Sequence, residues 1–154
     1  MSKNNLKKLI RDYLNTAVMM QIATSKSNQP WACTVYFTHD EYFNLYWLSL
    51  PSRRHSEEIR TNEKVAGTIV LPHTLGDDVR GLQFQGIARE LATKEEAILG
   101  MQYYAKRYGM SQDRVTSIVE NKDGHLCYKI TPSLFVLFDE LNFPDNSRQE
   151  YKII

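Results

Sequence analysis

Four consecutive residues, Ser52, Arg53, Arg54 and His55, place a hydroxyl and three basic side chains directly behind a proline. An apolar, strand-like run precedes them and SEEIRT follows, so they fall at a predicted helix N-terminus. That end carries roughly half a positive charge, which favours anions over cations. A bound phosphate would explain the arrangement, because Ser52 as N-cap, free N–H groups, two guanidinium forks and an imidazole would converge on it.

The same residues also allow a plainer interpretation, a solvated helix face. Arg53 and Glu57, like Arg54 and Glu58, are four residues apart and can form surface ion pairs. Such pairs contribute only about 0.2–0.5 kcal/mol, and with the base before the acid both members oppose the helix dipole. The residues alone leave phosphate capture and a solvated face about equally open.

The neighbouring strands limit which phosphate ester would fit. Trp47 and the aromatic run before it predict an apolar wall. Thr34 and Gln83 are polar residues in otherwise apolar strands, where they could hydrogen-bond a planar heterocycle. A phosphate at one end and a flat ring at the other indicate a mononucleotide. For Gln83 the alternative is a solvent-facing strand side shared with Gln85.

Other chemistries find less support. The glycines form neither a G-x-G-x-x-G nor a G-x-x-x-x-G-K motif. The histidines fall in separate segments, which argues against a metal site. No G-x-S-x-G turn accompanies the serines around His55, so a serine hydrolase is not indicated. Cys33 lies mid-strand and is interpreted as a small buried hydrophobe rather than a reactive thiol.

Composition sets the broad class. The 154 residues are 42% hydrophobic, which predicts one domain, residues 1–154, with a substantial core. Nineteen basic and eighteen acidic residues are predicted to give a net charge of +1, so no overall field favours nucleic acid or a membrane. Cys33 and Cys127 form no C-x-x-C pair, and the first twenty residues lack a continuous apolar run. A soluble cytoplasmic protein is expected.

Besides the short helix after Pro51, which is predicted to end near Asn62, helical patterns occur at three places. An apolar stripe predicts an N-terminal helix that lies on a sheet, with Asn4 or Asn5 as its cap. The members of this stripe are Leu6, Leu9, Ile10, Tyr13, Leu14 and Ala17. Thr93 and Glu96 form a capping box for a helix that ends at Gly109, and a shorter helix follows Ser111.

Aromatic and branched runs predict hairpin-paired strands. They span residues 18–24, 31–38, 43–50, 65–71, 79–91, 126–131 and 134–141, with a possible edge strand at 149–154. Pro132 separates two of them. The Trp47 strand is apolar on both faces, so the barrel interior should cover one and a helix or a partner subunit the other. Hairpins with few helices favour a closed or split antiparallel barrel over a parallel sheet.

Three segments carry a family resemblance, PWACTVYF, LYWLSLPSRRHSEEIRTNEKVAGTIV and VRGLQFQGIAREL, in this order and spacing. The chain resembles the FMN-binding split-barrel proteins related to pyridoxamine 5′-phosphate oxidase, and looks most like their small bacterial branch. The resemblance covers residues 14–91 well and the C-terminal third in outline. It implies a mainly β fold, an antiparallel split β-barrel with Greek-key-like connections, an N-terminal helix and helices covering the barrel.

The resemblance also implies a cofactor site. It places the FMN phosphate on Ser52, Arg53, Arg54 and His55. The isoalloxazine would lie along Ala32, Cys33, Thr34, Val35, Trp47, Leu48 and Ser49. A glutamine from the other subunit reaches the flavin in the family, and Gln83 is its match, so the site would straddle a homodimer interface. Arg54 replaces the family's usual lysine, and Gly81 replaces the oxidase's glutamine.

The implied function is an FMN-dependent oxidoreductase acting on an unidentified small molecule. The segment LFDELNFPDNSRQEYKII lacks the arginine and tryptophan pattern with which the oxidase grips pyridoxal phosphate. Pyridoxamine 5′-phosphate is therefore not the expected substrate. Two alternatives stay open: a non-catalytic flavin or haem carrier, and a cofactor-free barrel whose basic cluster is only a surface or interface feature.

Overall fold

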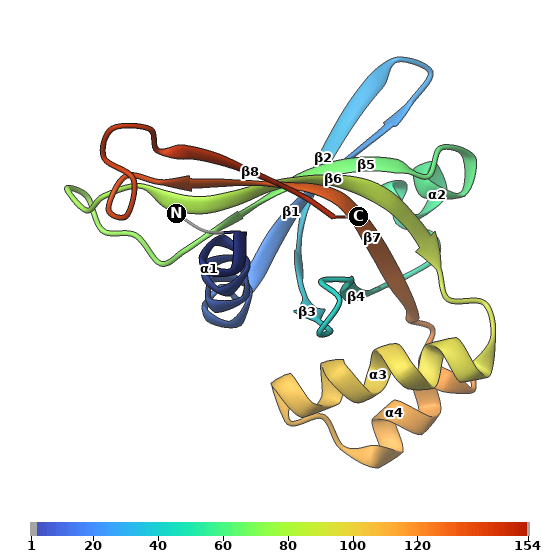
Figure 1. Cartoon of the computed structure of the whole chain (residues 1–154). Coiled ribbons are helices and arrows are strands. Elements are labelled where there is room, and N and C mark those ends of the chain that lie inside the picture. Colours follow the sequence, from blue (N-terminus) through green and yellow to red (C-terminus); the bar gives the residue numbers. More distant parts are fainter. Residues whose placement is uncertain (1–2, 154) are drawn as a thin grey trace.

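The computed structural model describes residues 3–153 and shows one strongly curled antiparallel sheet with helices packed against it (Figure 1). The strands follow the order β2-β1-β5-β6-β7-β4-β3, and β8 pairs with β7. Their bounds are β1 Met19–Lys26, β2 Gln29–Tyr36, β3 Thr38–His39, β4 Leu45–Ser49, β5 Lys64–Val70, β6 Arg80–Glu90, β7 Leu126–Asp139 and β8 Arg148–Lys152. The helices are α1 Lys3–Thr16, α2 Arg54–Thr61, α3 Lys94–Tyr108 and α4 Gln112–Val119.

Two predicted hairpins are present, and the one expected between residues 31–38 and 43–50 is reduced to the short pair of β3 and β4, because β2 lies at the other end of the sheet. β1 and β2 join through Ser27 and Asn28, whose φ angles of 51° and 62° suit the right-handed twist of a tight hairpin. β3 pairs with β4, and β5 pairs with β6 along its whole length. The register places Gln21 beside Thr34 on one side and beside Thr68 on the other. With this register the apolar residues that alternate with Gln21 and Thr68 on β1 and β5 face the same interior.

The prediction of two strands around Pro132 is wrong, because β7 runs through the proline as one strand. Before Pro132 its free edge pairs with β4, and after it with β8. On the other edge the register to β6 shifts between Gln85 and Gly86. A Cβ on Gly86 would meet the carbonyl oxygen of Thr131, so glycine permits this close approach. The bulge accommodates the proline, and at this point the free edge of β7 changes its partner from β4 to β8.

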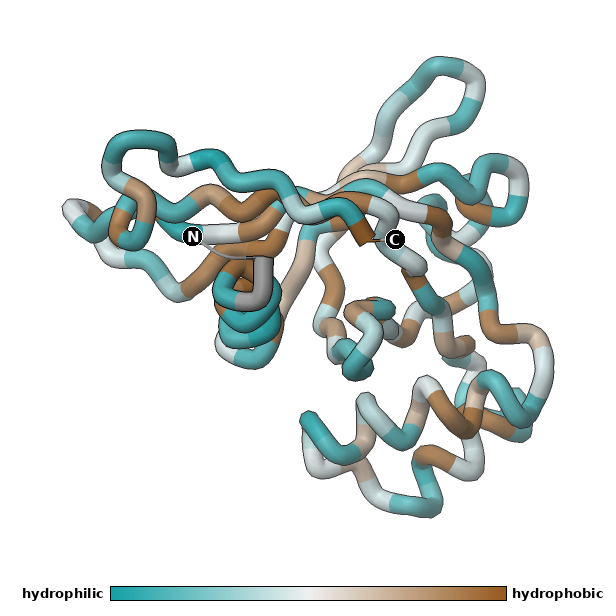
Figure 2. The backbone as a smooth tube through the Cα atoms, in the orientation of Figure 1, coloured by the Kyte–Doolittle hydropathy of each residue, from teal (hydrophilic) through white to brown (hydrophobic). Residues whose placement is uncertain are grey.

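The core fills the inside of the curled sheet, and α1 closes one part of it. Ile10 and Leu14 are fully buried on its apolar stripe, as predicted. Asn4 and Asn5 both lie inside α1, which spans Lys3–Thr16, so neither is the predicted N-cap. Figure 2 shows hydrophobic residues concentrated along the strands and hydrophilic ones in the outer loops. None of the four helices within residues 3–153 is long and apolar enough to cross a membrane.

β4 is covered on both faces, as predicted. Trp47 stacks on Tyr128 inside the barrel, with their ring centroids 5.1 Å apart. Tyr46 faces the other way and stacks on Tyr103 of α3 at 5.8 Å. Phe43 lies before the strand in a left-handed turn with φ of 70°, so β4 begins at Leu45, two residues later than predicted. The outer cover of β4 within this chain is helical.

Both caps predicted for α3 are confirmed. The Thr93 hydroxyl accepts a hydrogen bond from the Glu96 amide at 3.2 Å, and Gly109 ends the helix in the left-handed conformation. Ser111 caps α4 in the same way through the Arg114 amide. These local signals set the ends of α3 and α4, and packing against β3, β4 and β7 places the two helices where they form one wall of the cavity described below.

Candidate functional site

The predicted basic residues lie at the start of α2, in residues 51–55, which we call the arginine corner. The Arg53 amide donates to the Leu50 carbonyl at 3.1 Å, and this turn encloses Ser52. Arg53, with extended φ and ψ of −72° and 144°, is the N-cap, and no side chain in the described part of the chain caps the helix. The prediction of Ser52 as N-cap is wrong because the turn delays the helix by one residue. The first N–H groups of α2 therefore lack a side-chain acceptor.

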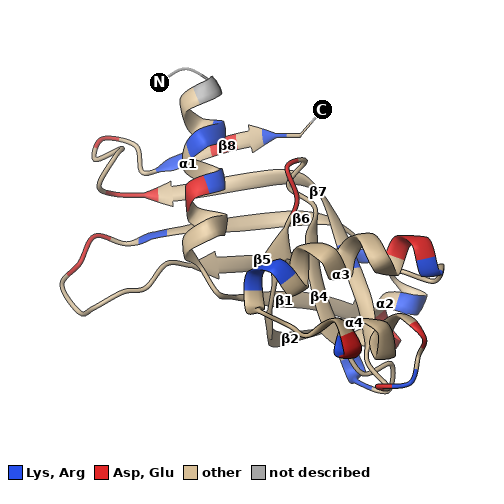
Figure 3. Cartoon of the chain, turned by 90° about the horizontal axis from the view of Figure 1, so that it is seen from below, with Lys and Arg blue, Asp and Glu red and all other residues tan. Residues whose placement is uncertain are grey.

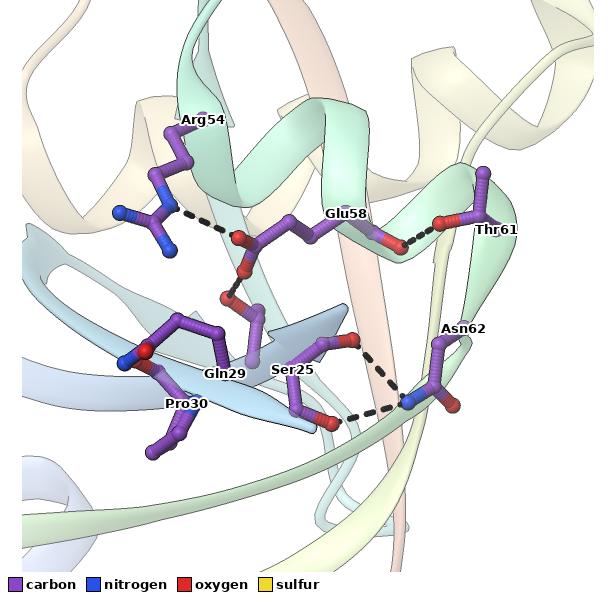
Figure 4. Close-up of polar contacts among 8 residues, drawn as sticks. Ser25, Gln29, Pro30, Arg54, Glu58, Thr61 and Asn62 are labelled. Atoms are coloured by element: carbon purple, nitrogen blue, oxygen red, sulfur yellow. Dashed lines mark hydrogen bonds and ion pairs between the residues drawn. The ribbon is translucent and has the colours of Figure 1, made fainter. Parts of the chain in front are cut away.

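Arg54 is held in a defined orientation (Figure 4). Its Nε donates to Glu58 Oε1 at 2.8 Å, and its guanidinium lies 4.3 Å from the ring centroid of Trp31. The side chain remains 44% exposed, and its two Nη groups have no partner among residues 3–153. A guanidinium oriented through Nε and stacked on a ring keeps its outer donors available for an anion.

Glu58 shows that this pair differs from a surface ion pair. Its carboxylate is buried, and Oε2 accepts the Thr24 hydroxyl at 2.5 Å. The hydrogen bonds from Thr24 and Arg54 lower the pKa of Glu58, so it stays charged near neutrality. No ion pair joins Arg53 to Glu57 in the described part of the chain. The solvated-face interpretation thus fits Arg53 better than Arg54.

His55 turns away from solvent. It is buried, and its Nε2 lies 2.7 Å from the Ser49 hydroxyl on β4. Burial lowers the pKa of His55, with a further contribution from the charge of Arg53. The imidazole is therefore neutral near pH 7 and serves to tie α2 to β4. The structure brings the predicted residues His55 and Ser49 together, but in this role the histidine is no exposed cation.

The two predicted ring-binding strands stand near opposite ends of the sheet path, yet they touch because the sheet curls. On β2, Ala32 and Thr34 face outwards, while Cys33 and Val35 pack against the core. On β4, the Trp47 side chain is fully buried. Trp47 therefore cannot be the predicted apolar wall.

Leu48, next to it, is partly exposed on the opposite face of β4. The exposed indole at the arginine corner is instead that of Trp31, which stacks on Arg54. No local sequence pattern reveals this contact.

Gln83 lies on what we call the outer face, the side of β1, β5 and β6 that faces away from the core. Its central part is formed by Met19, Gln21, Ala23, Ala66, Thr68, Val70, Gln83, Gln85 and Ile87, and the exposed Lys64 and Arg89 continue it at one edge. Gln83 pairs with Thr68 on β5 and with Val136 on β7. α2 meets β6 at its C-terminal end, through Arg60 and Glu90, so Gln83 does not meet the arginine corner within one copy of the chain.

One cavity contains residues that the sequence did not single out. We call it the tyrosine pocket; it has a volume of about 600 Å³, and its main lining residues are Tyr36, Leu48, Tyr104, Tyr108, Arg114 and His125. They come from β2, β4, α3, α4 and the loop before β7. Leu48 also belongs to the predicted ring-binding set. No sequence motif joins residues so far apart, so only the fold reveals the pocket.

The remaining groups give little chemistry. Burial raises the pKa of Cys33, and it raises that of Cys127 to about 12, so both thiols stay protonated. No cluster of histidine, cysteine and carboxylate side chains suited to a metal occurs in the described residues. The arginine corner and the tyrosine pocket are therefore the two places to interpret.

Solved structures with the same architecture define the class. A candidate pyridoxamine 5′-phosphate oxidase from Listeria innocua superposes with a TM-score of 0.66 at 20% identity, covering 86% of this chain and 97% of that one. An FAD-binding protein from Mesorhizobium loti gives 0.62 at 16%, covering 81% and 88%. The haem storage protein HutZ from Vibrio cholerae gives 0.65 at 16%, covering 82% and 89%. The chain thus has the split-barrel fold of pyridoxamine 5′-phosphate oxidase-like proteins, which confirms the predicted fold class.

Two proteins are similar in sequence. UPF0306 protein PM1958 of Pasteurella multocida is 31% identical over 85 residues, which are 54% of this chain and 57% of that protein. UPF0306 protein YE0465 of Yersinia enterocolitica is 23% identical over 105 residues, 68% of this chain and 71% of that protein. The first match therefore spans less than two thirds of its relative's length. No protein-family profile matches the chain.

Proposed function

We propose that the protein binds FMN at the arginine corner as a homodimer and acts as a flavin-dependent oxidoreductase on a small molecule. One observation carries the proposal: within residues 3–153 the N-terminus of α2 has no side-chain cap, and the adjacent Arg54 is oriented with its outer donors unpaired. Helix N–H groups and a guanidinium fork are together a common phosphate site. Similarity of fold to an FAD-binding protein agrees with a flavin ligand.

The chain's own groups divide the work of holding such a ligand. Arg54 and the exposed Arg53 supply positive charge, and the first N–H groups of α2 supply directed donors. Neutral His55 keeps α2 against β4 through Ser49, so it positions the corner instead of adding charge. Ala32 and Thr34 offer the accessible strand surface for a ring. The flavin, when bound, supplies the two-electron chemistry.

The outer face supports a homodimer. The nine residues of its central part are uncharged, with Lys64 and Arg89 at one edge, and Met19, Val70 and Ile87 are exposed there by 46%, 55% and 39%. α1 packs inside the curl of the sheet and α3 covers the outer side of β4, another part of the sheet (Figure 1), and Figure 3 shows the middle strands largely without charged residues. Exposed uncharged sheet surface favours association with a second copy. In such a dimer Gln83 would contact the partner's flavin.

Addition of FMN tests the proposal directly. We expect saturating FMN to raise the melting temperature of the purified protein and to quench or shift the flavin fluorescence on binding. Linkage predicts about 2.7 kcal/mol of added stability at a hundredfold excess over Kd. Absence of both changes at saturating FMN would reject flavin binding.

Substitution of Gln83 tests the shared site. Gln83→Ala should weaken FMN several-fold, because a neutral hydrogen bond contributes about 0.5–1.5 kcal/mol, while the protein stays dimeric by sedimentation. Gln85→Ala is the matched control, two residues along the same exposed strand side. Equal affinity in the wild type and Gln83→Ala would withdraw Gln83 from the site.

A non-catalytic carrier is the second candidate, since the fold is shared with a haem storage protein. The two functions differ in turnover. An oxidoreductase should consume NADH, NADPH or another donor in the presence of an acceptor, with a rate proportional to bound flavin. A flavin-loaded protein that is inert with all donors and acceptors tried would favour the carrier.

A further inference from the structure

The tyrosine pocket has walls that suit a flat ring. The rings of Tyr104 and Tyr108 lie 4.7 Å apart, and Tyr36 meets Tyr108 edge-on at 5.8 Å. Tyr36 is 54% exposed, so an aromatic edge is open to solvent at the cavity. A volume of about 600 Å³ is within the range of small-molecule sites. Stacking on such walls recognises planar ligands through their faces and edges.

The tyrosine hydroxyls add little charge to these walls. Tyr108 donates to the Phe37 carbonyl at 2.5 Å, so its hydroxyl is committed to the backbone. Burial raises the pKa of Tyr104 to about 12, so this group is neutral near pH 7. The tyrosines therefore present rings, and the charge of the pocket comes from elsewhere.

That charge lies at one rim, where Asp123 organises two basic residues. His125 Nδ1 is bonded to Asp123 Oδ1, and Arg114 Nε lies 3.6 Å from Asp123 Oδ2. The side chains of His125 and Arg114 are 36% and 53% exposed. With Nδ1 held by the carboxylate, Nε2 is the ring nitrogen left for a ligand, and it has no partner among the described residues. A carboxylate-bound imidazole beside an arginine favours a ligand that donates a proton to the imidazole and becomes an anion.

We propose that the tyrosine pocket binds a flat aromatic molecule carrying one acidic hydroxyl, and that His125, oriented by Asp123, takes the hydroxyl proton at Nε2. The O–H bond breaks and an N–H bond forms. Asp123 stabilises the resulting imidazolium, and Arg114 faces the ligand oxyanion. Tyr36, Tyr104 and Tyr108 are the other titratable groups around this cavity.

The placement beside a cofactor rests on the proposed function, through one shared residue. Leu48 lines the tyrosine pocket and also belongs to the strand expected to carry the flavin ring. On β2, Tyr36 comes directly after Val35, the last residue of that strand predicted to lie along the flavin ring. The pocket thus adjoins the proposed ring site, and a phenol or its chemical equivalent is the ligand class it would take.

The probe is 4-nitrophenol, which is coloured only as the phenolate, titrated into flavin-free protein. We expect saturable binding with an increased phenolate fraction. His125→Gln should lower the affinity about tenfold and abolish the colour change, because a charge-assisted hydrogen bond is lost. His73→Gln, in the exposed β5–β6 loop, is the matched control and should behave as wild type. Asp123→Asn should still bind the probe, with a smaller phenolate fraction.

Three results would overturn the proposal: no saturable binding, a colour change in His125→Gln as large as in the wild type, or mutual exclusion of nitrophenol and FMN. If His125→Gln does not fold, Arg114→Ala replaces it. Removal of this exposed side chain should lower phenolate affinity several-fold without loss of structure. Failure of FMN to bind would reject the flavin site only. The flavin-free titration would then still decide whether the tyrosine pocket takes a phenol.

Discussion

Arg54→Ala is expected to weaken FMN binding by roughly tenfold to a hundredfold while leaving riboflavin nearly unaffected. A charge-assisted hydrogen bond to phosphate contributes about 1.5–3 kcal/mol, and riboflavin has no phosphate to lose. Arg54 is suited to this role because Nε is held by buried Glu58 and the guanidinium rests on Trp31, so its outer donors are already oriented.

Equilibrium titrations with FMN and riboflavin measure the two affinities on the same protein samples. Arg148→Ala is the matched control, since Arg148 is also an exposed arginine paired with a glutamate but lies on β8. Arg54→Lys should recover part of the affinity through charge, without the fork. Equal loss of FMN and riboflavin in Arg54→Ala would move the phosphate away from the arginine corner.

Asp139→Ala is expected to lower the free energy of unfolding by about 3 kcal/mol. Asp139 is fully buried, accepts the Tyr13 hydroxyl from α1, and accepts the Asn142 amide at 2.8 Å. Leaving a buried donor unpaired costs about 1–3 kcal/mol, and more than one partner is lost here. Urea denaturation measures the change, with exposed Asp145→Ala in the neighbouring loop as the control. A loss below about 1 kcal/mol would show that α1 does not depend on this carboxylate.

The same carboxylate predicts a pH dependence. Burial alone would raise the pKa of Asp139, but hydrogen bonds from Tyr13 and Asn142 outweigh it and lower the pKa. A lowered folded-state pKa means that the stabilisation is present above the unfolded value, about 3.9, and is lost as pH falls through the folded one. Acid should therefore destabilise the wild type more steeply below about pH 4 than it destabilises Asp139→Asn. Parallel curves would contradict this linkage.

Features of the fold that depend on neighbouring residues could be predicted from the sequence. Thr93 and Gly109 bound α3, and alternating apolar residues paired the strands into hairpins, because caps and alternation act within a few residues. Three local predictions were wrong. Pro132 sits inside β7, Ser52 lies in a turn before its helix, and Asn4 and Asn5 fall within α1. For Pro132, pairing of β7 with its neighbouring strands overrode the local tendency of proline to end a strand. For Ser52, the hydrogen bond from the Arg53 amide to the Leu50 carbonyl formed a turn where the local pattern predicted a cap.

The candidate site, too, has features that adjacent residues determine and features that only packing determines. The sequence by itself determined that two arginines and a histidine stand together at the start of a helix behind an apolar strand, since adjacency in the chain guarantees it. Only the tertiary structure decided that Arg54 is oriented by a buried Glu58 and exposed Trp31, that His55 turns inward to Ser49, and that Trp47 is core.

The tyrosine pocket depends on the tertiary structure entirely. Its residues come from two strands, two helices and a loop that meet when the sheet curls and α3 and α4 cover β4. Burial and side-chain direction are set by packing between distant segments, which no short pattern of residues encodes.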